Sequence, residues 1–195
     1  GGGSTRSVSS KEDADIEQLD EAAVMSLSIE RYVEKCQEMG GEAAAEWTLW
    51  VHKVFDDLME KFAIRQIKAR ADGILCVSGS SDIANDYHRT AVSRLLRFAA
   101  EASRALEGTK DTRIKGAVCA GRLNVVLLQD GEVNTRVVVY GEPVNACMRM
   151  EVTALGGEAL ISRVAMDKLR DELMDQQSDI PSPIAPSSPP WPPEL

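Results

Sequence analysis

The sequence has 195 residues, of which 44% are apolar and 27% carry a charge. This composition suits one folded domain of ordinary size with tails, and it excludes a chain that is disordered along its whole length. With 22 basic and 31 acidic residues the formal net charge is −9, which argues against the basic surface that nucleic-acid-binding proteins need.

In the first half of the chain the pattern predicts two helices and three short strands. The segment Glu42–Phe62 places Trp47, Val51 and Phe55 on one stripe at helical spacing. The other elements are expected at Val24–Ile29, Ile64–Lys68 and Ile74–Val77, and from a cap at Ser81 or Asp82 to about Leu106. Ala71-Asp72-Gly73 is expected to form the turn of a hairpin between the second and third strands.

The second half of the chain is richer in strands. These are expected at Arg113–Cys119, Leu123–Leu128, Arg136–Tyr140 and Glu158–Ile161, with a turn at Asp130-Gly131. A helix is expected over Val144–Leu155, and a last helix capped by Ser162 runs to about Leu173. Helices that return repeatedly to one sheet indicate an α+β fold.

The two ends of the chain differ from its middle in composition. Residues 1–20 begin Gly-Gly-Gly-Ser and stay polar, so we expect a flexible linker or tag remnant. The folded domain is expected over residues 21–175. All but one of the eight prolines follow Asp179, so residues 176–195 are expected to form a disordered Pro-rich tail.

The sequence also carries expectations about the compartment. No apolar run approaches the about 20 residues that a membrane span needs, and no signal peptide opens the chain. The four cysteines form no C-x-x-C pair, so we expect them to be reduced. We therefore expect a soluble cytoplasmic domain that makes no membrane contact itself and can belong to a larger membrane or multidomain protein.

One segment of the second half has a distinctive order of residues. Tyr140-Gly-Glu-Pro-Val-Asn-Ala-Cys-Met-Arg-Met-Glu151 resembles the aromatic-Gly-x-x-Val-Asn-x-x-x-Arg-x-Glu stretch of class III adenylyl and guanylyl cyclases. Asn145 and Arg149 are four residues apart, so on a helix they project from one face. The resemblance implies that Asn145 orients the ribose and that Arg149 neutralises charge on the triphosphate during ring closure. An ordinary helix with a surface Asn and Arg is the simpler alternative.

A second segment resembles the same family. Ile67-Lys68-Ala-Arg-Ala-Asp72-Gly-Ile-Leu-Cys-Val-Ser-Gly79 is similar to the hairpin that carries the family's second metal-binding Asp, and Asp72 takes that position. Lys68 lies where adenylyl cyclases place a purine-reading Lys and guanylyl cyclases a Glu. Val138 falls where these enzymes place a second purine-reading Asp or a Cys, and a valine cannot hydrogen-bond a base.

The third segment departs from the family. The family's first metal-binding Asp, in an Asp-Ile/Val-x-x-Phe-Thr motif, corresponds to Ser28, with Ile29 and Tyr32 in the matching frame. Cyclisation in this family uses Mg²⁺ or Mn²⁺ ions held between two Asp side chains, and a neutral Ser hydroxyl is a poor bridge between them. The resemblance therefore implies metal ions only in a complemented active site and little or no activity in a homodimer.

The resemblance extends over about Val24–Leu173 and implies a ferredoxin-like βαββαβ cyclase fold with an extra C-terminal strand and helix. Because family members build each site across a head-to-tail dimer, the first interpretation is a half that needs a homo- or heterodimeric cyclase partner and ATP or GTP. The second is an inactive pseudo-cyclase that regulates or dimerises, which Val138 and the segment Ala117–Gly121, poorer in glycine than the family's, would favour. The third is an unrelated ferredoxin-like interaction domain.

Overall fold

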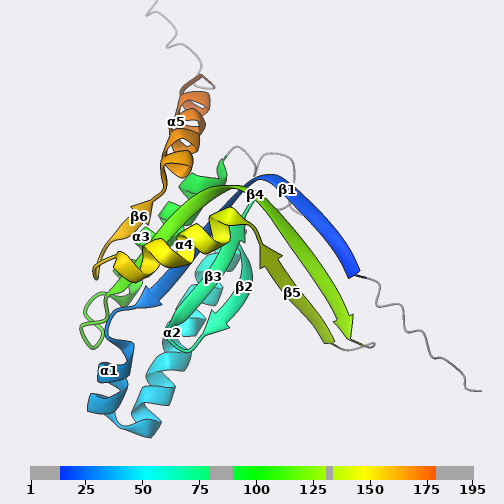
Figure 1. Cartoon of the computed structure of the whole chain (residues 1–195). Coiled ribbons are helices and arrows are strands. Elements are labelled where there is room, and N and C mark those ends of the chain that lie inside the picture. Colours follow the sequence, from blue (N-terminus) through cyan, green and yellow to red (C-terminus); the bar gives the residue numbers. More distant parts are fainter. Residues whose placement is uncertain (1–13, 80–89, 131–133, 179–195) are drawn as a thin grey trace, which may run out of the picture.

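The computed structural model describes residues 14–79, 90–130 and 134–178, and this part of the chain forms a six-stranded sheet with five helices (Figure 1). The elements are β1 (Ala14–Ile29), α1 (Tyr32–Met39), α2 (Gly41–Lys61), β2 (Arg65–Arg70), β3 (Gly73–Ser78), α3 (Ala91–Leu106), β4 (Ile114–Asp130), β5 (Asn134–Tyr140), α4 (Glu142–Thr153), β6 (Ala159–Ile161) and α5 (Arg163–Ser178). The strand order is β2-β3-β1-β4-β5, with β6 parallel to β4. The first four strands thus have ferredoxin-like order, and the expected α+β class is confirmed.

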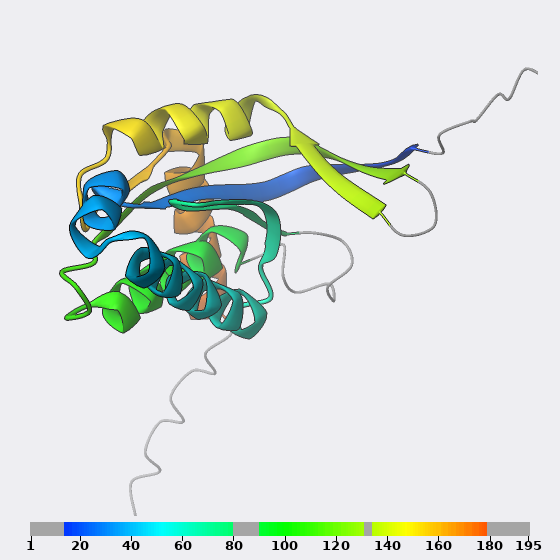
Figure 2. The same ribbon diagram turned by 90° about the horizontal axis from the view of Figure 1, so that it is seen from below.

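The alternating side chains of β1 build a separate core on each face of the sheet. Met25 and Leu27 belong to the larger core with α2 and α3, whereas Val24 packs with residues of α4. Figure 2 shows this division edge-on, with α4 covering one face of the sheet and α2 and α3 the other. Ser26 and Ser28 alternate with Met25 and Leu27, so their hydroxyl groups lie on the α4 face.

The larger core forms around the apolar stripe of α2. Trp47, Val51 and Phe55 are buried along one side of this helix, as their spacing predicts, and the expected helix is confirmed within one residue at each end. Phe55 meets Phe98 of α3 edge to face, with ring centroids 6.3 Å apart. Burial of these aromatic rings attaches both helices to the same face of the sheet.

The smaller core attaches α4 to the opposite face. Val144 and Cys147 of α4 are buried against β1 and β4. The sulfur of Cys147 lies 3.0 Å from the carbonyl oxygen of Ala117 and accepts a hydrogen bond from the amide of Ser26 at 3.2 Å. Its hydrogen bond with Cys119 and its burial both raise the pKa of Cys147, which therefore stays a neutral thiol. These contacts fix which side of α4 faces the sheet.

Two long strands correct the expected boundaries. β1 begins at Ala14 rather than Val24, so the expected linker of residues 1–20 overlaps this strand. The two strands expected at Arg113–Cys119 and Leu123–Leu128 are one continuous β4. Both strands continue because they pair with each other, and the register shifts between Leu19 and Ala22 of β1, opposite the part of β4 that contains Gly121. The extra residue lies on β1, and such a bulge bends a strand without ending it.

The helices bring further corrections. α1 was not predicted from the sequence; none of its residues is fully buried, but Tyr32, Cys36 and Met39 form a short stripe that packs partly buried against the larger core. Ser162 caps α5 by accepting a hydrogen bond from the amide of Ala165 at 3.2 Å, as expected, but the helix continues to Ser178 and overlaps the expected tail. In the described ranges α3 begins at Ala91, and its expected caps, like Gly131 of the expected turn, lie outside them. None of the described helices is long and apolar enough to cross a membrane.

Candidate active site

The end of β1 and the tip of the β2–β3 hairpin meet at one point of the sheet. Ser28 pairs with Gly73, and the amide of Ile29 donates a hydrogen bond to the carbonyl oxygen of Asp72 at 2.7 Å. A Cβ atom on Gly73 would lie 2.0 Å from the carbonyl oxygen of Leu27, so only glycine permits this approach. The structure therefore brings together Ser28 and Asp72, the two positions that the sequence assigns to metal ligands.

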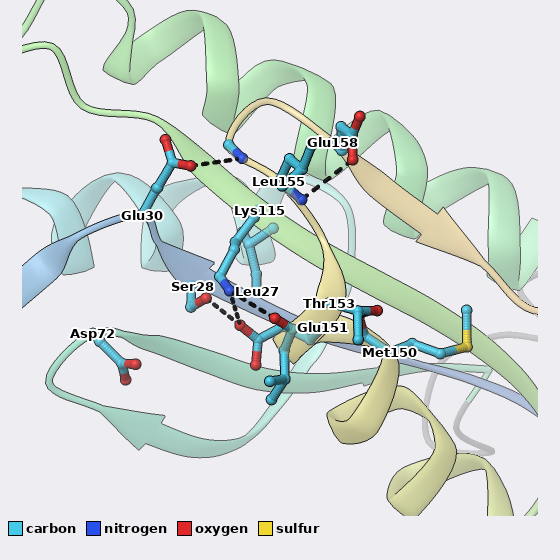
Figure 3. A network of polar contacts seen from close by, with 12 residues as sticks. Leu27, Ser28, Glu30, Asp72, Lys115, Met150, Glu151, Thr153, Leu155 and Glu158 are labelled. Carbon is cyan, nitrogen blue, oxygen red and sulfur yellow. Dashed lines mark hydrogen bonds and ion pairs between the residues drawn. The ribbon is translucent and has the colours of Figure 1, made fainter.

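The hydroxyl of Ser28 is already engaged inside the chain. It donates a hydrogen bond to Oε1 of Glu151, which reaches this point from the buried side of α4. Lys115 of β4 places its Nζ 3.9 Å from the same oxygen, and Figure 3 shows both side chains pointing to the carboxylate. Glu151 is only 6% exposed, so these partners replace the water that a carboxylate otherwise needs.

Arg70 links this carboxylate to the hairpin. Its Nε lies 3.3 Å from Oδ1 of Asp72, and its Nη2 lies 3.6 Å from Oε2 of Glu151. The same Nη2 donates to the carbonyl oxygen of Leu27 at 3.5 Å. Two carboxylates, one guanidinium and the ammonium of Lys115 therefore form a network whose formal charges cancel. We call these four charged side chains and Ser28 the Glu151 network.

Sequence reasoning gave no role to Arg70, Lys115 or Glu151. Two signals for Glu151 were present: it ends the stretch that resembles the cyclase family, and it follows Val144 and Cys147 at positions i+7 and i+4, so it continues the buried stripe of α4. A charged residue on an apolar stripe requires a buried partner. The two cations that pair with it come from β2 and β4, and their meeting depends on the sheet topology.

The residues around Ser28 do not fit a pair of divalent metal ions. Such ions require several anionic oxygens, and Ser28 offers a neutral hydroxyl that is bound to Glu151. Within the described ranges no three His, Cys, Asp or Glu side chains are grouped so as to hold a metal ion. Arg70 and Lys115 add two fixed positive charges at the same place.

Asn145 and Arg149 lie on a different side of α4 from Glu151. Both are exposed, whereas Val144, Cys147 and Glu151 of the same helix are buried. The helical spacing therefore turns the amide and the guanidinium outward, on one face, as predicted. Within the part of the chain that the structure describes, neither side chain takes part in a hydrogen bond or ion pair, so both are open to a ligand or a second chain.

The two positions expected to contact the base lie on other strands. Lys68 is an exposed residue of β2, on the edge of the sheet. Val138 lies on β5, next to β4 on the other side, and is 43% exposed. The structure does not join these residues to the Glu151 network. Both side chains instead face solvent: Lys68 offers a cationic hydrogen-bond donor, and Val138 an apolar surface.

Several solved structures share this fold. They include an atypical dimeric guanylyl cyclase domain of the RhoGC fusion protein from the aquatic fungus Blastocladiella emersonii, with a TM-score of 0.70 and 17% identity over 80% of this chain and 87% of that chain. The guanylate cyclase domain of RhGC from Catenaria anguillulae in complex with GTP gives 0.68 and 17%, over 79% and 84%. The adenylyl cyclase CyaB from P. aeruginosa gives 0.66 and 20%, over 80% and 83%.

A search among curated proteins gives no match. The family model described as the adenylate and guanylate cyclase catalytic domain, in contrast, matches residues 14–182, which include every element from β1 to α5. This match covers most of the 195 residues. Together with the ferredoxin-like strand order, it establishes that the chain belongs to the adenylate and guanylate cyclase catalytic domain family.

Proposed function

We propose that this domain supplies the half of a dimer-interface cyclase site that lacks metal ligands, and that a second cyclase domain supplies the metal-binding carboxylates. One observation carries this proposal: α4 presents Asn145 and Arg149 outward while its inner side is closed by the Glu151 network. A chain arranged in this way offers transition-state contacts to a partner but no metal site of its own. The product would be a 3′,5′-cyclic nucleotide used in signalling.

Arg149 suits the charge that develops in this reaction. The ribose 3′-oxygen forms a bond to the α-phosphorus, the bond to the bridging oxygen breaks, and pyrophosphate leaves with the electron pair. A guanidinium keeps its charge at every physiological pH and offers a planar fork of donors to phosphate oxygens. Asn145, one helical turn earlier, can hold the ribose in line by donating and accepting hydrogen bonds.

Adenine and guanine both suit the residues that are expected to contact the base. Lys68 can only donate, so it fits N1 of adenine and O6 of guanine equally well. Val138 contributes shape without a hydrogen bond. Both enzyme types occur among the structural relatives, since one is a guanylate cyclase domain with bound GTP and another an adenylyl cyclase. We propose ATP or GTP as the substrate class, with Mg²⁺ or Mn²⁺ carried by the partner.

Complementation with a defective partner tests the proposal. The partner should be a class III cyclase domain that keeps both metal-binding Asp residues but has Ala in place of its own transition-state arginine. Neither domain alone should form cyclic nucleotide from ATP or GTP with Mn²⁺, and the mixture should. Arg149→Ala should lower the rate of the mixture about 100-fold, the usual effect of removing one transition-state donor. Arg170→Ala, an exposed arginine on α5, is the matched control.

A second outcome would favour the pseudo-cyclase. Sedimentation of the mixture shows whether the two domains associate, which separates failed pairing from failed catalysis. If they associate and no partner yields cyclic nucleotide, the half-site proposal is wrong, and a regulatory or dimerising role replaces it. The neutral Glu151 network and the apolar Val138 are the observations that would support this alternative.

A further inference from the structure

A cation of the chain itself pairs with Asp72, one of the two expected metal ligands, and with Glu151, the partner of the other. The guanidinium of Arg70 reaches the carboxylates of both Asp72 and Glu151, at 3.3 and 3.6 Å, and the carbonyl oxygen of Leu27 at 3.5 Å. We propose that Arg70 is the resident cation of this half-site. In this proposal Ser28 and Arg70 together, rather than Ser28 alone, keep divalent metal ions out.

The charge balance supports a joint effect. Asp72 and Glu151 carry two negative charges, and Arg70 and Lys115 carry two positive ones within 3.9 Å of them. A divalent ion entering this network meets no net negative charge and is repelled by the nearby guanidinium. A carboxylate at position 28 would add one negative charge next to Leu27, whose carbonyl oxygen accepts a hydrogen bond from Arg70 at 3.5 Å. Restoring the missing Asp therefore does not by itself create a metal site.

Arg70 and Glu151 are both largely shielded from solvent. The side chain of Arg70 is 23% exposed and that of Glu151 only 7%, so solvent screening of the pair is weak. This guanidinium contacts three parts of the fold: the end of β1, the tip of the β2–β3 hairpin and α4. Arg70 thus has the bridging role between chain segments that bound metal ions often have.

Manganese binding to the full chain, without nucleotide or partner, tests this inference. Calorimetric titration with MnCl₂ should give no saturable binding for the unchanged chain or for S28D. The double variant S28D/R70M should bind Mn²⁺ at least about tenfold more tightly than S28D, because three carboxylates then face one another without the guanidinium. Because no partner domain is present, this result is independent of whether Asn145 and Arg149 serve a shared active site.

Two controls isolate the charge of Arg70. S28D/R70K keeps a cation at the position and should bind Mn²⁺ as weakly as S28D. S28D/R65M removes an arginine from the same strand, where Arg65 pairs with Glu17 at 3.6 Å instead, and should also bind weakly. Equal Mn²⁺ affinity of S28D and S28D/R70M would overturn the inference.

A measurement on the stable proteins covers the case in which S28D/R70M does not fold. Thermal unfolding of the unchanged chain and of S28D should occur at the same temperature in MnCl₂ and in EDTA, since a ligand that binds only the folded state raises that temperature. A clear rise for S28D in MnCl₂ would show that Arg70 does not exclude the metal, and the inference would be wrong.

Discussion

Ser28 of β1 and Glu151 of α4 are 123 positions apart, yet the hydroxyl of one donates a hydrogen bond to the carboxylate of the other in a buried site. The pairing joins two of the segments that resemble the cyclase family. The hydrogen bond also gives Ser28, which stands where the family has a metal-binding Asp, a structural role: it helps to satisfy the buried carboxylate of Glu151 on α4. Removing the hydroxyl should therefore weaken the attachment of α4 to β1.

We expect Ser28→Ala to lower the free energy of unfolding by about 2 kcal/mol, the range for a buried hydrogen bond to a charged group. Ser26 provides the matched control, since it lies two residues earlier on the same face of β1 and is fully buried. Its Oγ has no hydrogen-bond partner among the described residues, so Ser26→Ala should change stability by less than about 0.5 kcal/mol. Urea unfolding measures both, and equal losses would contradict the role given to Ser28.

A second buried acid should stabilise the opposite side of the sheet. Glu172 of α5 accepts hydrogen bonds from the amides of Val92 and Ser93 at 2.9 and 2.8 Å and so satisfies the first turn of α3. Glu172→Ala would leave these donors unpaired and should cost about 2 kcal/mol of unfolding free energy. The exposed neighbour Asp171 is the control, and Asp171→Ala should have little effect. Similar unfolding midpoints for the two variants would show that the cap is unimportant.

The cysteines should differ sharply in reactivity. Cys36 is partly exposed, whereas Cys76, Cys119 and Cys147 are buried. Burial raises the pKa of Cys76 to about 12, so it is a neutral as well as an inaccessible thiol. A hydrogen bond from Cys147 lowers the pKa of Cys119 to about 7, but this effect requires α4 to stay packed on β4, where Cys119 is buried.

A chromogenic disulfide reagent at neutral pH should therefore label Cys36 quickly and the other three thiols only after unfolding. All four should react in denaturant. In Cys36→Ser the fast phase should vanish, and Cys76, Cys119 and Cys147 should be modified only as the domain unfolds, as peptide mass analysis can show. Fast labelling of Cys76 would contradict the packing of β3.

The site was predictable from the sequence where its residues lie within one local motif. The spacing of Asn145 and Arg149 on a helix, and the place of Asp72 in a hairpin turn, depend on neighbours along the chain. The Arg70–Glu151 contact depends on the order of strands in the sheet and on which side of α4 faces it, and neither follows from local periodicity. The first residues of β1 also could not be predicted locally. Their polar sequence favours a linker, and they form a strand because they pair with β4.

The Glu151 carboxylate offers the most direct test of the network. Glu151→Gln keeps the shape of the side chain but leaves Arg70 and Lys115 without their shared anion, in surroundings where side chains of both are more than three quarters buried. Breaking a largely buried ion pair in this way should lower the free energy of unfolding by about 3 kcal/mol. Because the pair is poorly solvated, added salt should change this difference little.

Glu158 is the control for this substitution, because it is exposed and, among the described residues, its carboxylate accepts a hydrogen bond from the nearby amide of Leu155 alone, at 3.2 Å. Glu158→Gln should stay within about 0.5 kcal/mol of the unchanged chain. If Glu151→Gln were equally mild, Arg70 would have to be held mainly by Asp72 and the carbonyl oxygen of Leu27, and α4 by its apolar side chains. A strong loss that persists in high salt instead identifies Glu151 as the anion that holds the hairpin, β4 and α4 together.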